Sequence, residues 1–267
     1  MLTIKQSVKS LGLMPALAAS ALSFTGLAQA DAFDGGILIG WTCEGNCGTL
    51  GADGDVSASP EGGNYGYIAS NTGIEGLGLV GIGGTDGSRL RSGVFSAAAG
   101  DDLEFYFNYV TSDSPIYADY AWVRLLKSDL SEAALLFTAR TTPGGDTVPG
   151  YSLPDLNPGV TLAPATKTII GGGPVWSPLG GYSGACWSIG CGYTGWIKMT
   201  YDIASAGNYV LEFGVVDWMD EAVSSGLAFD GILVGGKPID EVPEPATLAL
   251  LGLGLAGLGF MRRKARV

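Results

Sequence analysis

The sequence contains no histidine, and this absence excludes several kinds of active site at once. A Ser-His-Asp triad and a Cys-His dyad need an imidazole as the general base, and many metal sites need it as a ligand. A Gly-rich phosphate-binding loop with its lysine is also missing. An enzyme built on this chain would therefore depend on carboxylates.

Basic residues are scarce. The chain has 14 Lys and Arg against 26 Asp and Glu, and six of the basic residues lie in segments 1–30 and 242–267. From Asp31 to Pro245 eight basic and all 26 acidic residues remain, which gives a net charge of −18. Phosphate backbones and anionic lipids bind clustered Lys and Arg, so we expect no nucleic-acid partner. The acidity suits solubility and divalent cations outside the cell, although a solvated acidic surface is the commoner explanation for it.

Cysteines are few and come in two close pairs, Cys43 with Cys47 and Cys186 with Cys191. In an oxidising compartment thiols close in sequence tend to pair, so we expect two small disulfide loops. Four cysteines allow three connectivities, and the sequence alone does not choose between them. A four-thiolate zinc site is the alternative, but its usual spacing of two intervening residues is absent.

No segment between residues 31 and 241 shows a helical period of useful length, and the many glycines disfavour one. Short β-type runs recur instead between Gly, Asn and Asp clusters. The expected strands are Gly36 to Trp41, Tyr65 to Ala69, Leu77 to Ile82, Leu103 to Val110, Ala121 to Leu126, Ala133 to Thr138, Trp196 to Asp202, Tyr209 to Asp217 and Gly226 to Val234. The sequence predicts one all-β domain over residues 31–241, an antiparallel β-sandwich of jelly-roll type.

Two details refine that prediction. Leu103, Phe105, Phe107 and Tyr109 alternate with polar neighbours, as in a strand with one buried face. The segments that begin at Phe33 and Phe229 share a Phe-Asp-Gly start, and we expect them to be neighbouring first and last strands. The Pro-rich stretch from Thr141 to Pro164 is expected to be a long surface excursion.

Both ends of the chain have the features of targeting signals. Lys5 and Lys9 precede an apolar stretch that ends in the small-x-small site of Ala28 and Ala30, so residues 1–30 are expected to be a signal peptide. At the other end, an uncharged run of 16 residues from Ala246 to Met261 precedes a basic cluster. At about 1.5 Å per residue a helix of that length is able to span most of a bilayer core, and the basic flank favours a cytoplasmic C-terminus.

Residues 242–267 contain, in this order, a Pro-Glu-Pro motif at Pro243-Glu244-Pro245, the apolar run and the basic tail. The C-terminal sorting signal of the PEP-CTERM family has the same order, so this segment resembles it. The resemblance implies export across the inner membrane of a Gram-negative bacterium, a signal peptidase and an exosortase as processing partners, and cleavage near Pro243, Glu244 and Pro245. The chain would touch the membrane only through this segment before processing. An ordinary single-pass anchor is the alternative.

The body is also similar to exported domains of this family. The similarity lies in the Leu-x-Phe-x-Phe-Asn strand at Leu103, the Asp-Tyr-Ala-x-Val strand at Asp119 and the Leu227 to Val234 strand. It implies a jelly-roll-like fold and an extracellular compartment, without assigning a reaction.

Five aromatic residues around the second cysteine pair are candidates for ligand binding: Trp176, Tyr182, Trp187, Tyr193 and Trp196. Exposed rings on rigid loops commonly grip sugar faces, whereas rings under a long loop fill a core. Both interpretations stay open at this point.

Loop acids are candidates for a structural calcium ion, with Asp113, Asp217, Asp220 and Glu221 as ligands, although they lack an EF-hand spacing. A hydrolase needs only two carboxylates, and seven acids lie on or near expected strands: Glu104, Asp113, Asp119, Asp217, Asp220, Glu221 and Asp230. Their spacing selects no pair.

The family resemblance favours a non-catalytic surface or extracellular-matrix protein that associates with exopolysaccharide and takes part in biofilm formation. A lectin-like carbohydrate-binding module and a carboxylate-dependent hydrolase of extracellular polymer are the alternatives. The first predicts no saturable small ligand, the second predicts loss of binding on Trp187→Ala, and the third predicts product release.

Overall fold

A computed structural model describes residues 32–142 and 144–239. The expected signal peptide with Ala28 and Ala30, the Pro243 to Pro245 motif, the apolar run and the basic tail lie outside these residues. Within the described ranges, no helix is long and apolar enough to cross a membrane.

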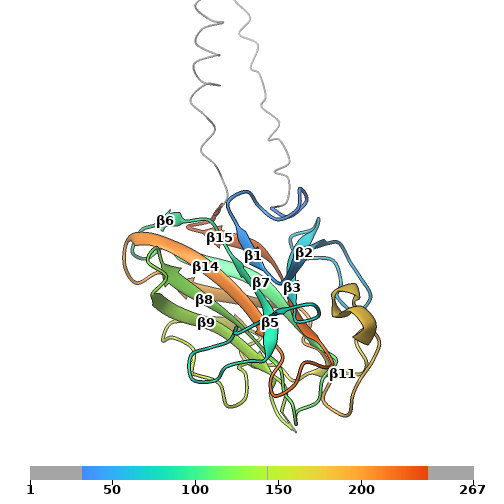
Figure 1. The fold of residues 1–267 in the computed structure, drawn as a ribbon. Coiled ribbons are helices and arrows are strands. Elements are labelled where there is room, and N and C mark those ends of the chain that lie inside the picture. Colours follow the sequence, from blue (N-terminus) through green and yellow to red (C-terminus); the bar gives the residue numbers. More distant parts are fainter. Residues whose placement is uncertain (1–31, 143, 240–267) are drawn as a thin grey trace, which may run out of the picture. The chain divides into compact units, whose positions relative to one another are not determined.

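The described chain folds into two antiparallel sheets that pack as layers (Figure 1). The first sheet has the order β1 (Thr42–Glu44), β5 (Asp86–Arg91), β14 (Gly207–Val216), β8 (Tyr120–Lys127) and β9 (Glu132–Arg140), with β4 (Ile74–Glu75) and β6 (Phe95–Ala97) at its margins. The second has the order β10 (Thr161–Ala163), β13 (Ile197–Asp202), β7 (Asp102–Thr111), β15 (Ser225–Val234), β3 (Tyr65–Ala69) and β2 (Asn46–Leu50). Short strands β11 (Ile170–Gly171), β12 (Gly192–Tyr193) and β16 (Lys237–Pro238) and a 3₁₀ helix, η1 (Ser177–Tyr182), complete the fold.

The chain changes sheet repeatedly, from β3 to β5, β7, β8 and β9, then β13, β14 and β15. Long connections that cross between two antiparallel sheets are typical of jelly rolls, so the predicted β-sandwich is confirmed.

Alternating side chains of the long central strands build the core. Leu103, Phe105, Phe107 and Tyr109 of β7 are all fully buried, as their spacing predicts. Between the sheets, Phe213 of β14 stacks on Phe229 of β15 with ring centroids 4.0 Å apart. This core holds the two sheets together and leaves the loops at the sandwich ends free to form sites.

Two expected strands are absent from the fold. Residues 36–41 and 77–82 form turns, because glycines such as Gly36 and Gly81 adopt positive φ angles of 100° and 83° that interrupt an extended strand. The Phe33 and Phe229 segments therefore do not pair as strands, and that prediction is wrong. The two segments meet through their rings instead, at 5.5 Å between centroids.

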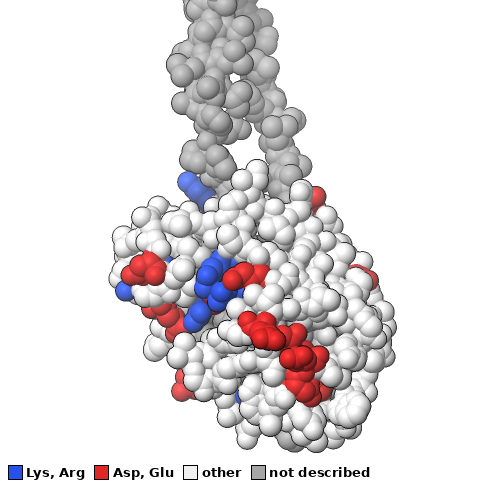
Figure 2. Space-filling model, viewed as in Figure 1, with Lys and Arg blue, Asp and Glu red and all other residues white. Residues whose placement is uncertain are grey.

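Strand β5 is a central strand that the sequence analysis missed. It reads Asp-Gly-Ser-Arg-Leu-Arg, and its charges hide the strand pattern. In the structure Arg91 pairs with Glu212 of β14 at 2.7 Å, and Arg124 of β8 reaches the same carboxylate at 2.6 Å. On the face of the molecule that Figure 2 shows, a group of basic side chains lies with acidic side chains beside it. Glu212 is fully buried, yet its arginines lower its pKa against the opposing effect of burial.

Candidate functional site

The cysteines pair locally as expected. Cys43 is bonded to Cys47 and Cys186 to Cys191, with Cα atoms 6.1 Å and 5.7 Å apart. The first bridge joins β1 of one sheet to β2 of the other. The second closes a short loop that carries Trp187.

The five candidate aromatic residues separate into two groups. Trp176 is fully buried, and its indole Nε1 donates a hydrogen bond to Tyr65 Oη at 3.0 Å. Tyr193 and Trp196 are half-buried against the same small cluster. These three rings stabilise a satellite core beside the second sheet, so the core interpretation applies to them.

Trp187 is different, since 65% of its side chain is exposed. Its backbone N–H donates to Ser112 O at 3.1 Å, and the Ser112 hydroxyl donates to Tyr182 O at 3.0 Å. The disulfide-closed loop is thus attached to the segment that follows β7. Tyr182 is half-buried and does not line the pocket described next.

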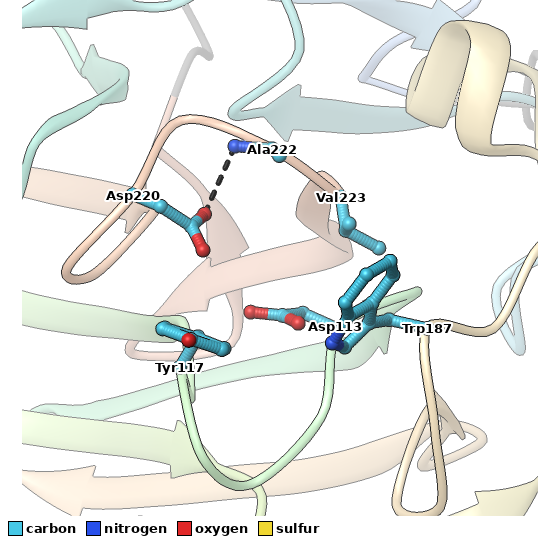
Figure 3. Close-up of a pocket in the computed structure, with 6 residues that line it drawn as sticks. All are labelled: Asp113, Tyr117, Trp187, Asp220, Ala222 and Val223. Atoms are coloured by element: carbon cyan, nitrogen blue, oxygen red, sulfur yellow. Dashed lines mark hydrogen bonds between the residues drawn. The ribbon is translucent and has the colours of Figure 1, made fainter.

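Trp187 borders a cavity of about 180 Å³, which we call the acidic pocket. Figure 3 shows Asp113 and Asp220 reaching it from two different loops, with the indole of Trp187 along one side. The complete lining is Asp113, Tyr117, Trp187, Asp220, Ala222 and Val223. Aromatic rings together with a few polar groups are a common lining of ligand sites.

The two carboxylates of the acidic pocket are held differently. Asp113 is 1% exposed; its Oδ1 accepts from the Ser114 N–H at 2.6 Å, whereas its Oδ2 has no hydrogen-bond partner among the described residues. Asp220 is half-buried and accepts from the Ala222 N–H at 2.9 Å. Burial, assisted by the charge of Asp220, raises the pKa of Asp113 to about 7. Asp113 therefore binds a proton at a much higher pH than an ordinary aspartate does.

Three further carboxyls, Asp86, Asp119 and Asp217, lie near the acidic pocket and interact electrostatically. Burial, reinforced by the charge of Asp86, raises the pKa of Asp217 to about 8. Burial and the charge of Asp217 likewise raise the pKa of Asp119. Asp119 accepts from the Ser225 hydroxyl at 2.7 Å and from the Trp218 N–H at 3.1 Å, so it fixes the start of the loop that carries Asp220. Nothing in the sequence pattern singles out Asp86.

The four expected calcium ligands do not come together. Asp113 and Asp220 line the acidic pocket, whereas the exposed Glu221 and the buried Asp217 do not. No group of three His, Cys, Asp or Glu residues in the described part of the chain is placed to hold a metal ion. Calcium takes six to eight oxygen ligands, so this pair of carboxylates does not fit it.

Of the seven acids considered for hydrolysis, only Asp113 and Asp220 share this pocket. Glu104 pairs with Lys198 at 2.7 Å on the second sheet, and Asp230 accepts from Ser59.

Three comparisons with known proteins complement this geometry. A model of the PEP-CTERM protein-sorting motif matches residues 241–264. No curated protein matches the chain.

Among solved structures, the K1 cleaved adhesin domain of Lys-gingipain from Porphyromonas gingivalis is similar at 12% identity and a TM-score of 0.38, over 78% of this chain and 97% of that one. The K3 domain of the same protein gives 14% identity and a TM-score of 0.33, over 76% and 95%. An alginate lyase from Corynebacterium sp. gives 13% identity and a TM-score of 0.30, over 64% and 76%.

The order of motif, apolar run and basic tail and the match at residues 241–264 lead to the same conclusion: this chain carries a PEP-CTERM sorting motif, the mark of an exported protein that an exosortase sorts to the cell surface.

Proposed function

We propose that this protein is a non-catalytic component of the surface or extracellular matrix of a Gram-negative bacterium, where it associates with exopolysaccharide. The observation that carries the proposal is the sorting motif at residues 241–264, which follows an acidic β-sandwich in the sequence. The absence of histidine from the whole chain supports a role without catalysis.

Intact-mass spectrometry of the protein from membrane and extracellular fractions of its host tests this proposal. We expect a body that begins at Asp31, ends near Pro243 to Pro245 and lacks four hydrogens for the two disulfides. Co-sedimentation with the host's exopolysaccharide provides the second measurement. A species that keeps residues 246–267 and occurs only in the membrane would contradict processing, and free protein in the sedimentation assay would contradict the polymer association.

A lectin-like module is the second candidate, and the exposure of Trp187 beside the acidic pocket favours it. The indole offers an apolar face for a sugar ring, and Asp113 and Asp220 are acceptors for its hydroxyls. Trp187→Ala should lower affinity for the host polymer about five- to tenfold, because one stacking contact is worth about 1 kcal/mol.

Ile189→Ala is the matched control for Trp187→Ala. Ile189 lies in the same disulfide loop, is 76% exposed and does not line the pocket. An equal loss in both variants would indicate a general effect of the loop and would overturn the lectin candidate. Purified protein should release no new reducing ends from the polymer, and release that Asp113→Asn abolishes would establish the hydrolase alternative.

A further inference from the structure

A second pocket lies beside the acidic pocket and contains a buried arginine, Arg140, at the end of β9. Arg140 is 5% exposed. Its Nε donates to Ala118 O at 2.9 Å, whereas Nη2 has no hydrogen-bond partner among the described residues. The structure shows no ion pair between Arg140 and any described carboxylate.

Aromatic rings hold the guanidinium in place. Its Cζ atom lies 4.4 Å from the ring centroid of Trp218 and 5.2 Å from that of Tyr120. Asp119 is near enough to act on Arg140 electrostatically, but its two oxygens accept hydrogen bonds from Ser225 and the Trp218 N–H. Burial lowers the pKa of Arg140, as expected for a cation that has lost water without gaining an ion-pair partner.

The pocket around Arg140, which we call the arginine pocket, has a volume of about 370 Å³. Tyr151 lines it with 62% of its side chain exposed, and Trp218 lines it half-buried. Thr141 is 1% exposed, and its hydroxyl also lacks a hydrogen-bond partner among the described residues. The complete lining is Gly81, Ile82, Pro115, Ala118, Arg140, Thr141, Tyr151, Ser152 and Trp218.

An unpaired buried cation is destabilising unless an anion completes its interactions. A guanidinium presents parallel N–H donors that match the two oxygens of a carboxylate, and the Thr141 hydroxyl adds a polar group in the same pocket. The pocket is larger than a carboxylate alone requires. The rings of Tyr151 and Trp218 offer apolar faces to the rest of the ligand that carries the carboxylate.

We propose that the arginine pocket binds the carboxylate of an acidic sugar unit, a uronate, within an extracellular polysaccharide. Arg140 binds the carboxylate, and Tyr151 and Trp218 contact the sugar ring. The inference rests on the proposed association with exopolysaccharide and adds the class of sugar that is recognised. The net charge of −18 over residues 31–245 repels anionic polymers at long range, so binding depends on this local cation.

Titration calorimetry of the full chain in detergent with a uronate trisaccharide tests the proposal, and the carboxyl-reduced trisaccharide of the same linkage is the matched ligand control. We expect saturable binding of the acidic trisaccharide and at least tenfold weaker binding of the neutral one, because hydrogen bonds to a charged group carry most of the affinity. Equal affinity for the two trisaccharides would overturn the proposal.

Two variants locate the site. Arg140→Gln should weaken uronate binding at least tenfold, and Tyr151→Ala about threefold to tenfold. Ile189→Ala, at an exposed residue that lines neither pocket, is the matched control and should leave uronate affinity unchanged. Near-ultraviolet circular dichroism reports whether Arg140→Gln remains folded. If it does not, the uronate affinity of Tyr151→Ala tests the site, because Tyr151 is exposed and its substitution should not unfold the protein. The site would be overturned if both variants are folded and bind uronate with unchanged affinity. It would also be overturned if Arg140→Gln is unfolded and Tyr151→Ala binds with unchanged affinity.

Competitors distinguish the class of anion. Inorganic phosphate, acetate or a peptide with a free C-terminal carboxylate should compete at least tenfold more weakly than the trisaccharide, and equal competition would overturn recognition of a sugar. Co-sedimentation with the host polymer separates the two proposals. If the protein sediments with the polymer but does not bind uronate, the inference fails and the proposed function stands.

Discussion

The acidic pocket and the arginine pocket share two loops and differ in charge. Asp113 and Tyr117 of the first loop line the acidic pocket, whereas Pro115 and Ala118 of the same loop line the arginine pocket. The second loop sends Asp220 to the former and Trp218 to the latter. The two loops thus supply the carboxylates of one pocket and uncharged walls of the other, whose positive charge comes from Arg140 at the end of β9.

The comparison also shows two outcomes of burying a charge without an ion pair. Asp113 responds by a raised pKa, so it is able to become neutral by binding a proton. Arg140 keeps its charge because a guanidinium does not deprotonate at physiological pH, and it depends on aromatic rings instead. A ligand anion has more to contribute at Arg140 than at Asp113.

The largest expected effect is on the free energy of unfolding, when a buried charge with ion-pair partners and one without them are removed. Glu212→Ala should destabilise the fold by about 3 kcal/mol, because it removes the ion-pair partner of Arg91 and one of the two partners of Arg124. Arg140→Met should be neutral or stabilising by about 1 kcal/mol, because it removes a buried cation that has no ion pair. Urea unfolding of both variants measures the difference. A larger loss for Arg140→Met than for Glu212→Ala would show that Arg140 is fully paired in solution.

A smaller effect is expected in the dependence of stability on pH. Asp217 and Asp113 have folded pKa values of about 8 and about 7, above the ordinary value of 3.8. The folded state therefore binds more protons than the unfolded state between about pH 4 and pH 8, and stability falls as the pH rises through that range. Asp217→Asn should remove much of this pH dependence and should raise the free energy of unfolding at pH 8 by a few kcal/mol relative to the wild type. Urea unfolding at several pH values measures this change.

The control for this pH dependence is Asp155→Asn, because Asp155 is exposed and lines neither pocket. A wild-type protein that is equally stable at pH 5 and pH 8 would contradict the raised pKa values and the charge contrast between the two pockets.

The smallest effect concerns the loop between the pockets. Met219 has a φ of 75° and is 62% exposed, so a side chain is strained there without a packing gain. Met219→Gly should stabilise the protein by about 0.5 to 1 kcal/mol, measured by thermal unfolding. Destabilisation would show that the loop adopts another conformation. Uronate affinity should stay within twofold of the wild-type value.

Local pattern was enough to predict the long strands. Residues 65–69 were predicted with the same bounds as β3, and the alternation in β7 identified its buried face correctly. Strand β5 was missed because Arg89 and Arg91 resemble a surface segment, and only their partners Glu44 and Glu212 on adjacent strands explain them. Leu77 and Leu79 look like strand residues, yet they bury their side chains from a loop that bonds to Tyr120.

The site was harder to predict. The sequence placed Trp176 and Trp187 in one aromatic group, and nothing in their spacing shows that one is fully buried and the other 65% exposed. Arg140 drew no attention because an arginine at a strand end is ordinary. Its unusual state arises from Ala118, Tyr120 and Trp218, which lie at least 20 residues away along the chain.

The sequence by itself determined the features that depend on composition and on order along the chain. These are the sorting motif at residues 241–264, the strong acidity and the period-2 strands of a sandwich. Only the tertiary structure decided which charges are buried, which are paired and which line a pocket. The physical reason is that solvation and Coulomb interactions depend on distances in space, and the loops that set these distances come from residues far apart in the chain.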